Sequence, residues 1–241
     1  MEKAAAVVIG AGDALGGAVA RAFADAGYIA CPVRRKADQL KPLADAIVAA
    51  GHKVHPVGAD ARKEDEVIAL FDAIERDVAP VEVCVFNVGA WYRESILTMS
   101  TRVFTKVWEM ANLAGFLTGR EAAKRMVARG RGTIIFTGAT ASMRGASEFG
   151  AFASAKSGLR ALAQSMAREL MPKNIHVAHV VVDGPIDTKF TRERFAERFA
   201  ELPADGVMAP DDIARNYLML HRQPRSAWTF ELDVRPWVEK W

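Results

Sequence analysis

This chain alternates short β-branched segments with longer segments of helical periodicity, and that alternation limits the folds open to it. A repeated strand–helix order is typical of a parallel sheet with helices on both of its faces. Residues 134–136 and 180–182 are continuously apolar, as expected for strands buried on both faces. We predict strands over residues 4–9, 29–33, 54–57, 83–86, 133–137, 176–182 and 229–234. We predict helices over 14–27, 37–50, 63–77, a long stretch after the fourth strand that ends near 129, 149–170, 192–201 and 210–221.

The length of the chain favours one domain. With 241 residues, of which 51% are hydrophobic, the chain can bury one large α/β core, whereas two compact domains would be short of residues. The sequence contains no repeat, low-complexity tract or linker. We therefore predict a single α/β domain over residues 1–241, with a Rossmann-type, doubly wound parallel sheet.

The charge and cysteine content exclude several other classes of protein. The net charge is +3, and basic residues are interleaved with acidic ones, as in Arg192-Glu193-Arg194, which is typical of a solvated helix face rather than a nucleic-acid surface. Cys31 and Cys84 lie in apolar segments, which favours buried free thiols in a reducing compartment. No apolar run reaches about 18 residues, and the start lacks a signal-peptide pattern. We expect a cytoplasmic protein without nucleic-acid or membrane partners.

A glycine-rich segment joins the first predicted strand to the first predicted helix. Glycines allow the backbone to turn tightly and to approach a pyrophosphate, and the start of the helix supplies free N–H groups. Any tight strand-to-helix turn would also use glycine, so the position of the segment in the chain carries the argument. The segment reads Gly10-Ala11-Gly12-Asp13-Ala14-Leu15-Gly16-Gly17. We predict a nucleotide phosphate site here, with contacts from Gly10, Gly12, Asp13, Leu15 and Gly16.

This turn resembles the motif T-G-x-x-x-G-h-G of the short-chain dehydrogenase/reductase family, where h is a hydrophobic residue. Gly10, Leu15 and Gly16 match the motif, while Ile9 replaces the threonine and Ala14 replaces the middle glycine. Alanine adds one methyl group, which is compatible with the turn if its φ angle is negative.

Further segments resemble motifs of the same family in the same order along nearly the whole chain. Asp60-Ala61 resembles the pair that contacts adenine, and Asn87-Val88-Gly89 resembles the end of the motif N-N-A-G. Asn112 falls at the family's mid-helix asparagine. The segment Asp183-Gly184-Pro185-Ile186-Asp187-Thr188 resembles P-G-x-x-x-T beside the nicotinamide, with Asp183 in place of proline. The resemblance implies cofactor contacts from Asp60, Ala61, Asn87, Gly89, Gly184, Ile186 and Thr188.

The second predicted strand ends in Arg34-Arg35-Lys36, with no acidic residue before Asp38. An acidic residue here would bond the ribose 2′-hydroxyl of NAD and repel a 2′-phosphate. Guanidinium groups suit a phosphate, because they offer a fork of donors and a permanent charge. We predict NADP(H) rather than NAD(H), with Arg34 as the first contact and Arg35 as the second. The alternative is a solvated basic loop.

The catalytic residues of the resembled family are only partly present. In that family a serine, a tyrosine and a lysine share the work, with an asparagine holding a water. Lys156 and Asn112 are kept, but Phe152 stands at the tyrosine position, one helical turn before the lysine, and Ala139 stands at the serine position, thirteen residues earlier. A phenyl ring has no proton to give. Because the family lysine also bonds the nicotinamide ribose, Lys156 is compatible with cofactor binding alone.

Other side chains could replace the missing proton donor. Thr140 and Ser142 lie near Ala139, although capping of a turn by their hydroxyl groups is the favoured interpretation. Tyr92 lies on a segment that often borders the family's substrate pocket, although a surface or interface aromatic beside Trp91 is the favoured interpretation. Asp183 could donate only if burial raised its pKa strongly.

The remaining titratable residues point away from other chemistry. His176 and His179 lie three apart on an apolar strand, hence on opposite faces, and are expected in the core. No His, Cys, Asp or Glu cluster has metal-ligand spacing, so no metal is expected.

The resemblance implies an NADP(H)-dependent oxidoreductase that transfers hydride between the nicotinamide and an unknown carbonyl or alcohol. The alternative is a non-catalytic dinucleotide-binding sensor or partner subunit on the same scaffold; a nucleic-acid binder has only the mild positive charge in its favour. The helices around 112–129 and 149–171 would form a homodimer or homotetramer interface. Residues 187–210, with Phe190, Phe195 and Phe199, would cover the substrate.

Overall fold

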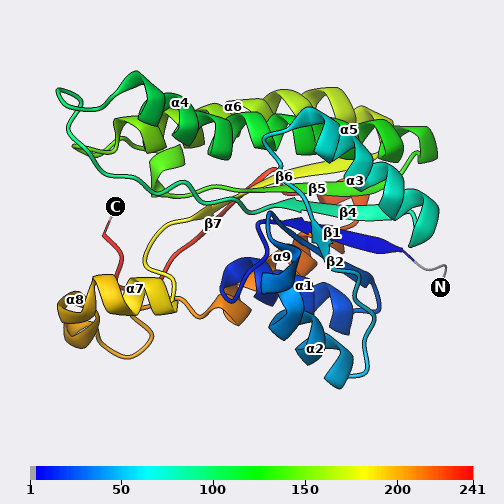
Figure 1. The fold of residues 1–241 in the computed structure, drawn as a ribbon, viewed down its shortest axis with the longest axis horizontal. Helices are drawn as coiled ribbons and strands as arrows, with labels where there is room; N and C mark the ends of the chain where they lie inside the picture. The colour runs from blue at the N-terminus through cyan, green and yellow to red at the C-terminus, as the bar shows by residue number, and fades with distance from the viewer. Residues whose placement is uncertain (1–3, 241) are drawn as a thin grey trace.

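The computed structural model describes residues 4–240 and contains one seven-stranded parallel sheet between two layers of helices (Figure 1). The strand order is β3-β2-β1-β4-β5-β6-β7, so the chain winds outward in both directions from β1 and β4. This confirms the predicted doubly wound α/β fold. The strands are β1 (Ala5–Ile9), β2 (Ile29–Arg34), β3 (Val57–Gly58), β4 (Val81–Phe86), β5 (Gly132–Thr137), β6 (Ile175–Val182) and β7 (Glu231–Val234).

Each face of the sheet has its own hydrophobic core, because successive strand residues point to opposite sides. Val7 and Cys84 pack toward one layer of helices, and their neighbours Val8 and Val85 pack toward the other. The first layer contains α3 (Glu64–Asp77), α4 (Thr101–Trp108), α5 (Ala114–Arg129) and α6 (Gly150–Leu170), and the second contains α1 (Leu15–Asp25), α2 (Lys41–Ala49) and α9 (Pro210–His221) (Figure 1). Both cysteines are buried free thiols, as predicted.

Two predicted elements are shorter in the structure. The third strand was expected over 54–57, but β3 holds only Val57 and Gly58, with a single bridge from Val54 to Ala30. Pro56 lies between these pairings and has no N–H to give to a ladder, which explains the interruption. The expected helix over 37–50 begins instead with a 3₁₀ turn at Ala37–Leu40 before α2.

The long helix expected after β4 is replaced by an extended segment and a broken helix. Residues 87–100 are not helical, and α4 begins only after Ser100, whose hydroxyl accepts a bond from the N–H of Val103. A π-helical turn at Glu109–Leu113 then separates α4 from α5. The prediction failed because apolar spacing reports buried positions and not where the backbone leaves the helix.

The segment predicted as one helix over 192–201 forms two short helices, α7 (Lys189–Arg194) and α8 (Ala196–Glu201). The Thr188 hydroxyl accepts a bond from the N–H of Thr191 and starts α7 earlier than predicted. Phe195 separates the two helices with φ −126° and ψ 36°, outside the helical region. Both helices lie beyond the helical layers, at the left in Figure 1.

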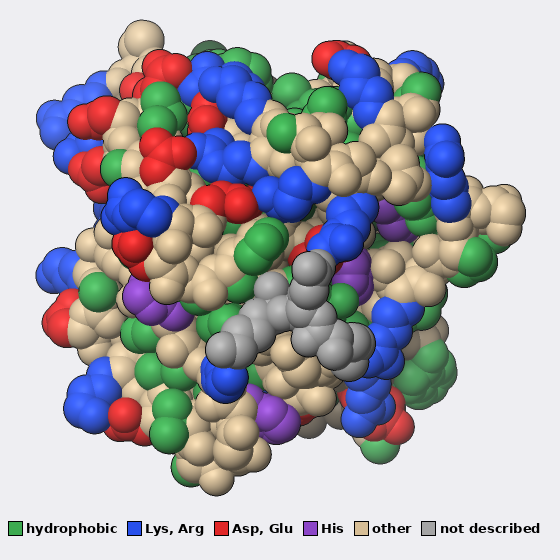
Figure 2. Space-filling view, turned by 90° about the vertical axis from the view of Figure 1, so that its right-hand side faces the viewer, with side chains coloured by type: hydrophobic (Ala, Val, Ile, Leu, Met, Phe, Trp, Pro, Cys, Tyr) green, Lys and Arg blue, Asp and Glu red, His purple; other side chains and the backbone are tan. Residues whose placement is uncertain are grey.

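Within residues 4–240, no helix combines the length and the apolar character needed to cross a bilayer. Acidic and basic side chains are interspersed over the described part of the face shown in Figure 2. The strand order reverses between β1 and β4, and in open parallel sheets ligands bind outside the carboxyl ends of the strands at such a point. A ligand site is therefore expected beyond Ile9 and Phe86, the last residues of those two strands.

Candidate functional site

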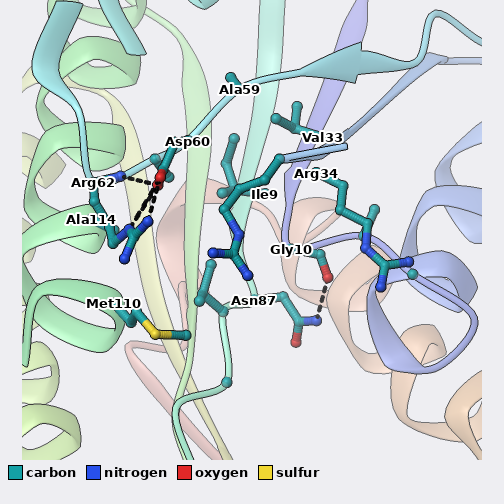
Figure 3. Close-up of a pocket in the computed structure, with 16 residues that line it drawn as sticks. Ile9, Gly10, Val33, Arg34, Ala59, Asp60, Arg62, Asn87, Met110 and Ala114 are labelled. Carbon is teal, nitrogen blue, oxygen red and sulfur yellow. Dashed lines mark hydrogen bonds and ion pairs between the residues drawn. The ribbon is translucent and has the colours of Figure 1, made fainter. Parts of the chain in front are cut away.

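Two adjoining cavities lie beyond the carboxyl ends of the strands. The smaller cavity, of about 260 Å³, lies between the ends of β1, β2 and β4 (Figure 3). The larger cavity, of about 1000 Å³, extends past β5 and β6 to α7 and α8. The two share the glycine turn and the residues after β4, so one elongated ligand could occupy both. The shared lining residues are Gly10, Gly12, Asn87, Val88 and Gly89.

The glycine turn is packed so tightly that larger residues do not fit at three positions, Gly10, Gly16 and Gly17. Gly10 has φ +83°, and a Cβ there would lie 2.5 Å from the carbonyl oxygen of Asn87. A Cβ at Gly16 would lie 2.4 Å from the carbonyl oxygen of Gly10, to which the Asn87 amide donates (Figure 3). Ala14, at the position of the family's middle glycine, has φ −109°, so its methyl group is tolerated as expected.

Helix α1 begins at this turn with no acidic residue in its first turn and no side-chain cap, so far as the described residues show. Leu15, Gly16 and the preceding Asp13 and Ala14 line the larger cavity. An uncapped helix start presents backbone N–H donors and positive potential, which suits a phosphate. The turn and the helix start therefore fit the pyrophosphate of a dinucleotide.

Three arginines and one carboxylate line the smaller cavity. Arg34 and Arg35 come from the end of β2, and Arg34 Nη1 lies 3.8 Å from Asp13 Oδ1. Arg62 faces Asp60 on the other side of the cavity, with Nε 2.9 Å from Oδ1 (Figure 3). The hydrogen bond from Arg62 lowers the pKa of the Asp60 carboxyl below its usual range. The smaller cavity thus carries more positive than negative charge, and Ala61 completes its lining.

Sequence reasoning did not single out Arg62, although its position two residues after Asp60 offered a signal. An arginine that close in the chain can reach back to the carboxylate, and the backbone N–H of Arg62 also donates to Asp60 Oδ1 at 3.1 Å. This paired arrangement fixes both side chains at the cavity.

Lys156 lies in the lining of the larger cavity and is only 3% exposed. Its Nζ donates to the carbonyl oxygens of Val88, at 3.1 Å, and Thr137, at 2.8 Å. Thr137 is the last residue of β5, and Val88 lies two residues beyond the end of the neighbouring β4. Burial lowers the pKa of the Lys156 ammonium to about 8. A buried cation with a strongly shifted pKa beside a cavity is a candidate functional group.

Asn112 lies behind this lysine rather than in the lining of either cavity. It belongs to the π-helical turn, and its amide donates to the carbonyl oxygen of Ala155 at 3.3 Å. A Cβ at Gly158 would lie 2.3 Å from the Asn112 amide nitrogen, so the asparagine packs directly on α6. The structure therefore brings Asn112 to the backbone beside Lys156.

The two positions that depart from the family's catalytic set both line the larger cavity. Phe152 is 9% exposed and packs in a small cluster with Ala90, Ala111 and Ala155. Ala139 packs against the same cluster. The cavity is thus apolar where the resembled family carries its hydroxyl groups.

Thr140 and Ser142 have different roles from one another. The Ser142 hydroxyl accepts a bond from the N–H of Ala139, as the capping interpretation predicts. Thr140 instead donates its hydroxyl proton to Asp183, whose side chain is 1% exposed. Arg144 makes two further bonds to Asp183, at 3.2 and 3.3 Å. A second guanidinium, that of Arg235, lies 3.5 Å from Asp183. The Asp183 carboxylate therefore accepts hydrogen bonds in this network and is not arranged as a proton donor.

Tyr92 and the histidines lie outside the cavity lining. The Tyr92 hydroxyl donates to Glu94 at 2.9 Å, and this bond raises its pKa. His179 bonds Glu231 at 3.0 Å, and burial lowers its pKa to about 4; His176 stacks on Trp228. Both histidines are core residues, as predicted.

The predicted contacts Gly184, Ile186 and Thr188 do line the larger cavity. No group of three or more side chains that could hold a metal ion occurs in the described part of the chain.

A family model for the short chain dehydrogenases matches residues 4–198. The chain belongs to this short-chain dehydrogenase family. A short-chain dehydrogenase from Rhodopseudomonas palustris has a solved structure with a TM-score of 0.84; it is 49% identical, and the match covers 97% of this chain and 99% of that one. A metagenomic short-chain oxidoreductase solved in complex with NADP is 25% identical, with a TM-score of 0.82 and 98% of both chains covered.

Curated short-chain dehydrogenases from other organisms are also similar. The 3-oxoacyl-acyl-carrier-protein reductase MabA of Mycobacterium tuberculosis is 33% identical over 190 residues, which cover 71% of this chain and 76% of that protein. The short-chain dehydrogenase/reductase eriH of Hericium erinaceus is 31% identical over 223 residues, 88% of each chain. Proteins of this short-chain dehydrogenase family bind nicotinamide dinucleotides.

Proposed function

We propose that this protein is an NADP(H)-dependent oxidoreductase that transfers hydride between the nicotinamide and the carbon of a carbonyl or alcohol group. The excess of arginine around the smaller cavity carries the choice of cofactor. The NADP complex of the metagenomic relative supports it. When bound, the cofactor supplies or receives the hydride. The protein binds and orients the cofactor and the substrate, and it excludes water from the site.

The proposed cofactor contacts follow the two cavities from end to end. Asp60 and Ala61 would hold the adenine, and Arg34 and Arg35 the 2′-phosphate. The glycine turn would hold the pyrophosphate, through Gly10, Gly12, Asp13, Leu15 and Gly16. Asn87, Gly89, Lys156, Gly184, Ile186 and Thr188 would hold the nicotinamide half.

The carboxylates near the proposed 2′-phosphate are already matched by cations. Asp60 is engaged by Arg62, and Asp13 lies near Arg34. Arg35 adds a further positive charge to the lining. A phosphate would therefore meet guanidinium groups, whose bonds to anions are among the stronger hydrogen bonds in proteins.

The apolar lining at Phe152 and Ala139 supports a second candidate, a dinucleotide-binding sensor or partner subunit without turnover. Positioning of cofactor and substrate alone can supply much of a rate enhancement, and general acid–base catalysis typically adds about a hundred- to ten-thousand-fold. Loss of the phenol therefore reduces the expected rate without excluding the oxidoreductase. Lys156 would serve in both cases by holding the ribose.

We also propose a homodimer or homotetramer formed through α5 and α6. Phe116 on α5 keeps 39% of its surface exposed, and apolar surface of that kind favours association. Light scattering at micromolar concentration tests this, and a monomer would contradict it.

Titration of the purified protein with NADPH and NADH tests the cofactor. We expect tighter NADPH binding in the wild type. Arg34→Ala should weaken NADPH binding about 10- to 100-fold, the equivalent of one charge-assisted hydrogen bond, and leave NADH binding nearly unchanged. Arg76→Ala is the matched control, because Arg76 also pairs with an aspartate but lies on α3 away from both cavities. Tighter NADH than NADPH binding would overturn the proposal.

Turnover distinguishes the oxidoreductase from the sensor. NADPH absorbance should fall when the protein is supplied with a panel of ketones and aldehydes. Tight NADPH binding without turnover would favour the sensor, provided that Thr140→Ala leaves this NADPH binding unchanged.

A further inference from the structure

Six aromatic rings line the larger cavity, and they come from three separate parts of the chain. One follows β4, two flank the start of α6, and three belong to α7, α8 and the residue between them. They are Trp91, Phe149, Phe152, Phe190, Phe195 and Phe199. Such a concentration of rings around one cavity indicates a ligand with large apolar surfaces.

Trp91 contacts three of the other five rings. Its ring centroid lies 5.6 Å from that of Phe149 and 6.2 Å from those of Phe190 and Phe195, all edge-to-face. The short helices α7 and α8 are thus packed onto the segment after β4. Trp91 nevertheless remains 39% exposed and Phe190 55% exposed, so the cavity keeps apolar surface that a ligand could cover.

The charged side chains around the rings are largely matched by partners of opposite charge. Asp187 is bonded by Arg192, and Lys189 lies 3.8 Å from Glu193. Arg144 is bonded through two nitrogens to the buried Asp183. Polar side chains such as Thr137, Thr188 and Lys156 also line the cavity, so the six rings, and not a lack of polar groups, favour a ligand with a large apolar surface.

Among the charged side chains of the lining, Arg144 can still donate a hydrogen bond to one oxygen atom of a ligand. A guanidinium carries five N–H groups, and the two bonds to Asp183 leave others for a ligand. The side chain is 44% exposed, and it lines the cavity together with Phe152 and Ala139, where the family's hydroxyl donors are missing. Thr140 cannot take this role in the same arrangement, because its proton is given to Asp183.

We propose that the larger cavity accepts a planar, uncharged, mainly apolar carbonyl compound, an aryl ketone or aldehyde, whose oxygen accepts a hydrogen bond from Arg144. The aromatic cluster binds the flat ring system, and the fixed cation polarises the carbonyl. This substrate class rests on the oxidoreductase proposed above. Arg144 would be a catalytic residue that stabilises the negative oxygen formed by hydride transfer, and that oxygen would take its proton from water, because a guanidinium does not release one. Asp183 would be its positioning residue.

Binding to the protein saturated with NADP⁺ tests the proposal without requiring turnover. The probes are 2-acetylnaphthalene, 2-ethylnaphthalene, which lacks the oxygen, and cyclohexyl methyl ketone, which lacks the flat ring; affinities are measured by calorimetry. We expect 2-acetylnaphthalene to bind at least 10-fold more tightly than either of the others. Equal or tighter binding of the cyclohexyl ketone, or no binding of 2-acetylnaphthalene up to its solubility limit, would overturn the proposal.

Variants test separately how the aromatic cluster and Arg144 contribute to the affinity for 2-acetylnaphthalene. Trp91→Leu should weaken 2-acetylnaphthalene binding about 10-fold, whereas Trp108→Leu should leave it unchanged. Trp108 is the matched control, because it is also 39% exposed but lies on α4 outside the cavity lining. Wild-type affinity in Trp91→Leu would contradict the aromatic site.

Arg144→Met should remove the preference for 2-acetylnaphthalene over 2-ethylnaphthalene while leaving affinity for the hydrocarbon and for NADP⁺ unchanged. A preference that survives the change would refute the role of Arg144. The same titrations without probe report cofactor binding. If the wild type does not bind NADP⁺, the proposed function is contradicted. If it binds NADP⁺ but not the aryl ketone, only the inferred substrate class is contradicted.

Discussion

The buried Lys156 makes a measurable prediction about stability. In the native protein its pKa is lowered from 10.5 to about 8, because its ammonium group is removed from water. At about 1.4 kcal/mol per pKa unit, keeping this charge in the cofactor-free protein costs roughly 3 kcal/mol at neutral pH. Lys156→Met keeps much of the side-chain volume and removes the charge. It also leaves the carbonyl oxygens of Val88 and Thr137 without their partner, a cost that does not depend on pH.

The pH dependence therefore isolates the charge from the lost hydrogen bonds. Below pH 8 the lysine is protonated in both the folded and the unfolded chain, so the full penalty applies. Between about pH 8 and 10.5 the unfolded chain binds more protons than the native one, and wild-type stability must rise with pH relative to the variant. The expected rise is about 1.4 kcal/mol per pH unit and roughly 3 kcal/mol in total.

Urea unfolding of wild type and Lys156→Met at pH 7, 8, 9 and 10 measures this difference. Lys53→Met is the control, because it makes the same replacement at an exposed lysine. A constant difference between wild type and Lys156→Met over this range would refute the reasoning. A lysine that destabilises the empty protein is expected where the charge is kept for a ligand.

Two further variants test the packing of the turn and the catalytic positions. Gly16→Ala should lower the free energy of unfolding by about 2 to 4 kcal/mol, because its Cβ would lie 2.4 Å from a backbone oxygen, whereas Gly145→Ala, whose Cβ would meet only Ala153 at 3.8 Å, should have little effect in the same urea experiment. The double variant Phe152→Tyr, Ala139→Ser should raise NADPH-dependent ketone reduction 100-fold or more if the site geometry is intact. Equal losses in the two glycine variants, or an unchanged reduction rate in the double variant, would contradict these interpretations.

The parts of the fold that depend on local patterns could be predicted from the sequence. Continuous apolar segments identified the buried strands β5 and β6, and the glycine turn identified the end of β1. The interrupted third strand was also foreseeable in principle, because Pro56 cannot donate to a ladder. Where one residue type determines backbone geometry, the sequence alone is sufficient.

The site could be predicted only where its residues are close in the chain or match a motif. The network of Thr140, Arg144 and Asp183 joins residues about 40 positions apart, and it depends on β5 and β6 being neighbours in register. The sequence indicated Asp183 as a departure from proline and as a conceivable proton donor, and not as the acceptor that binds Thr140 and Arg144. Tyr92 and Trp91 are adjacent in sequence, yet Trp91 lines the cavity and Tyr92 bonds Glu94 at the surface. Such differences follow from tertiary packing, which apolar spacing does not encode.

The π-helical turn at Glu109–Leu113 has a consequence for changes in chain length. A π turn closes over one residue more than an α turn, so it accommodates one extra residue while the helices before and after it keep their faces. Deleting one residue there would let the helix run on as a regular α-helix and would move residues of the turn by up to about 100° around the helix axis. Asn112, which reaches Ala155 from this turn, would then point elsewhere. The position of the Asn112 amide thus depends on the number of residues in the turn. Deleting one codon there could move the amide without replacing any functional side chain.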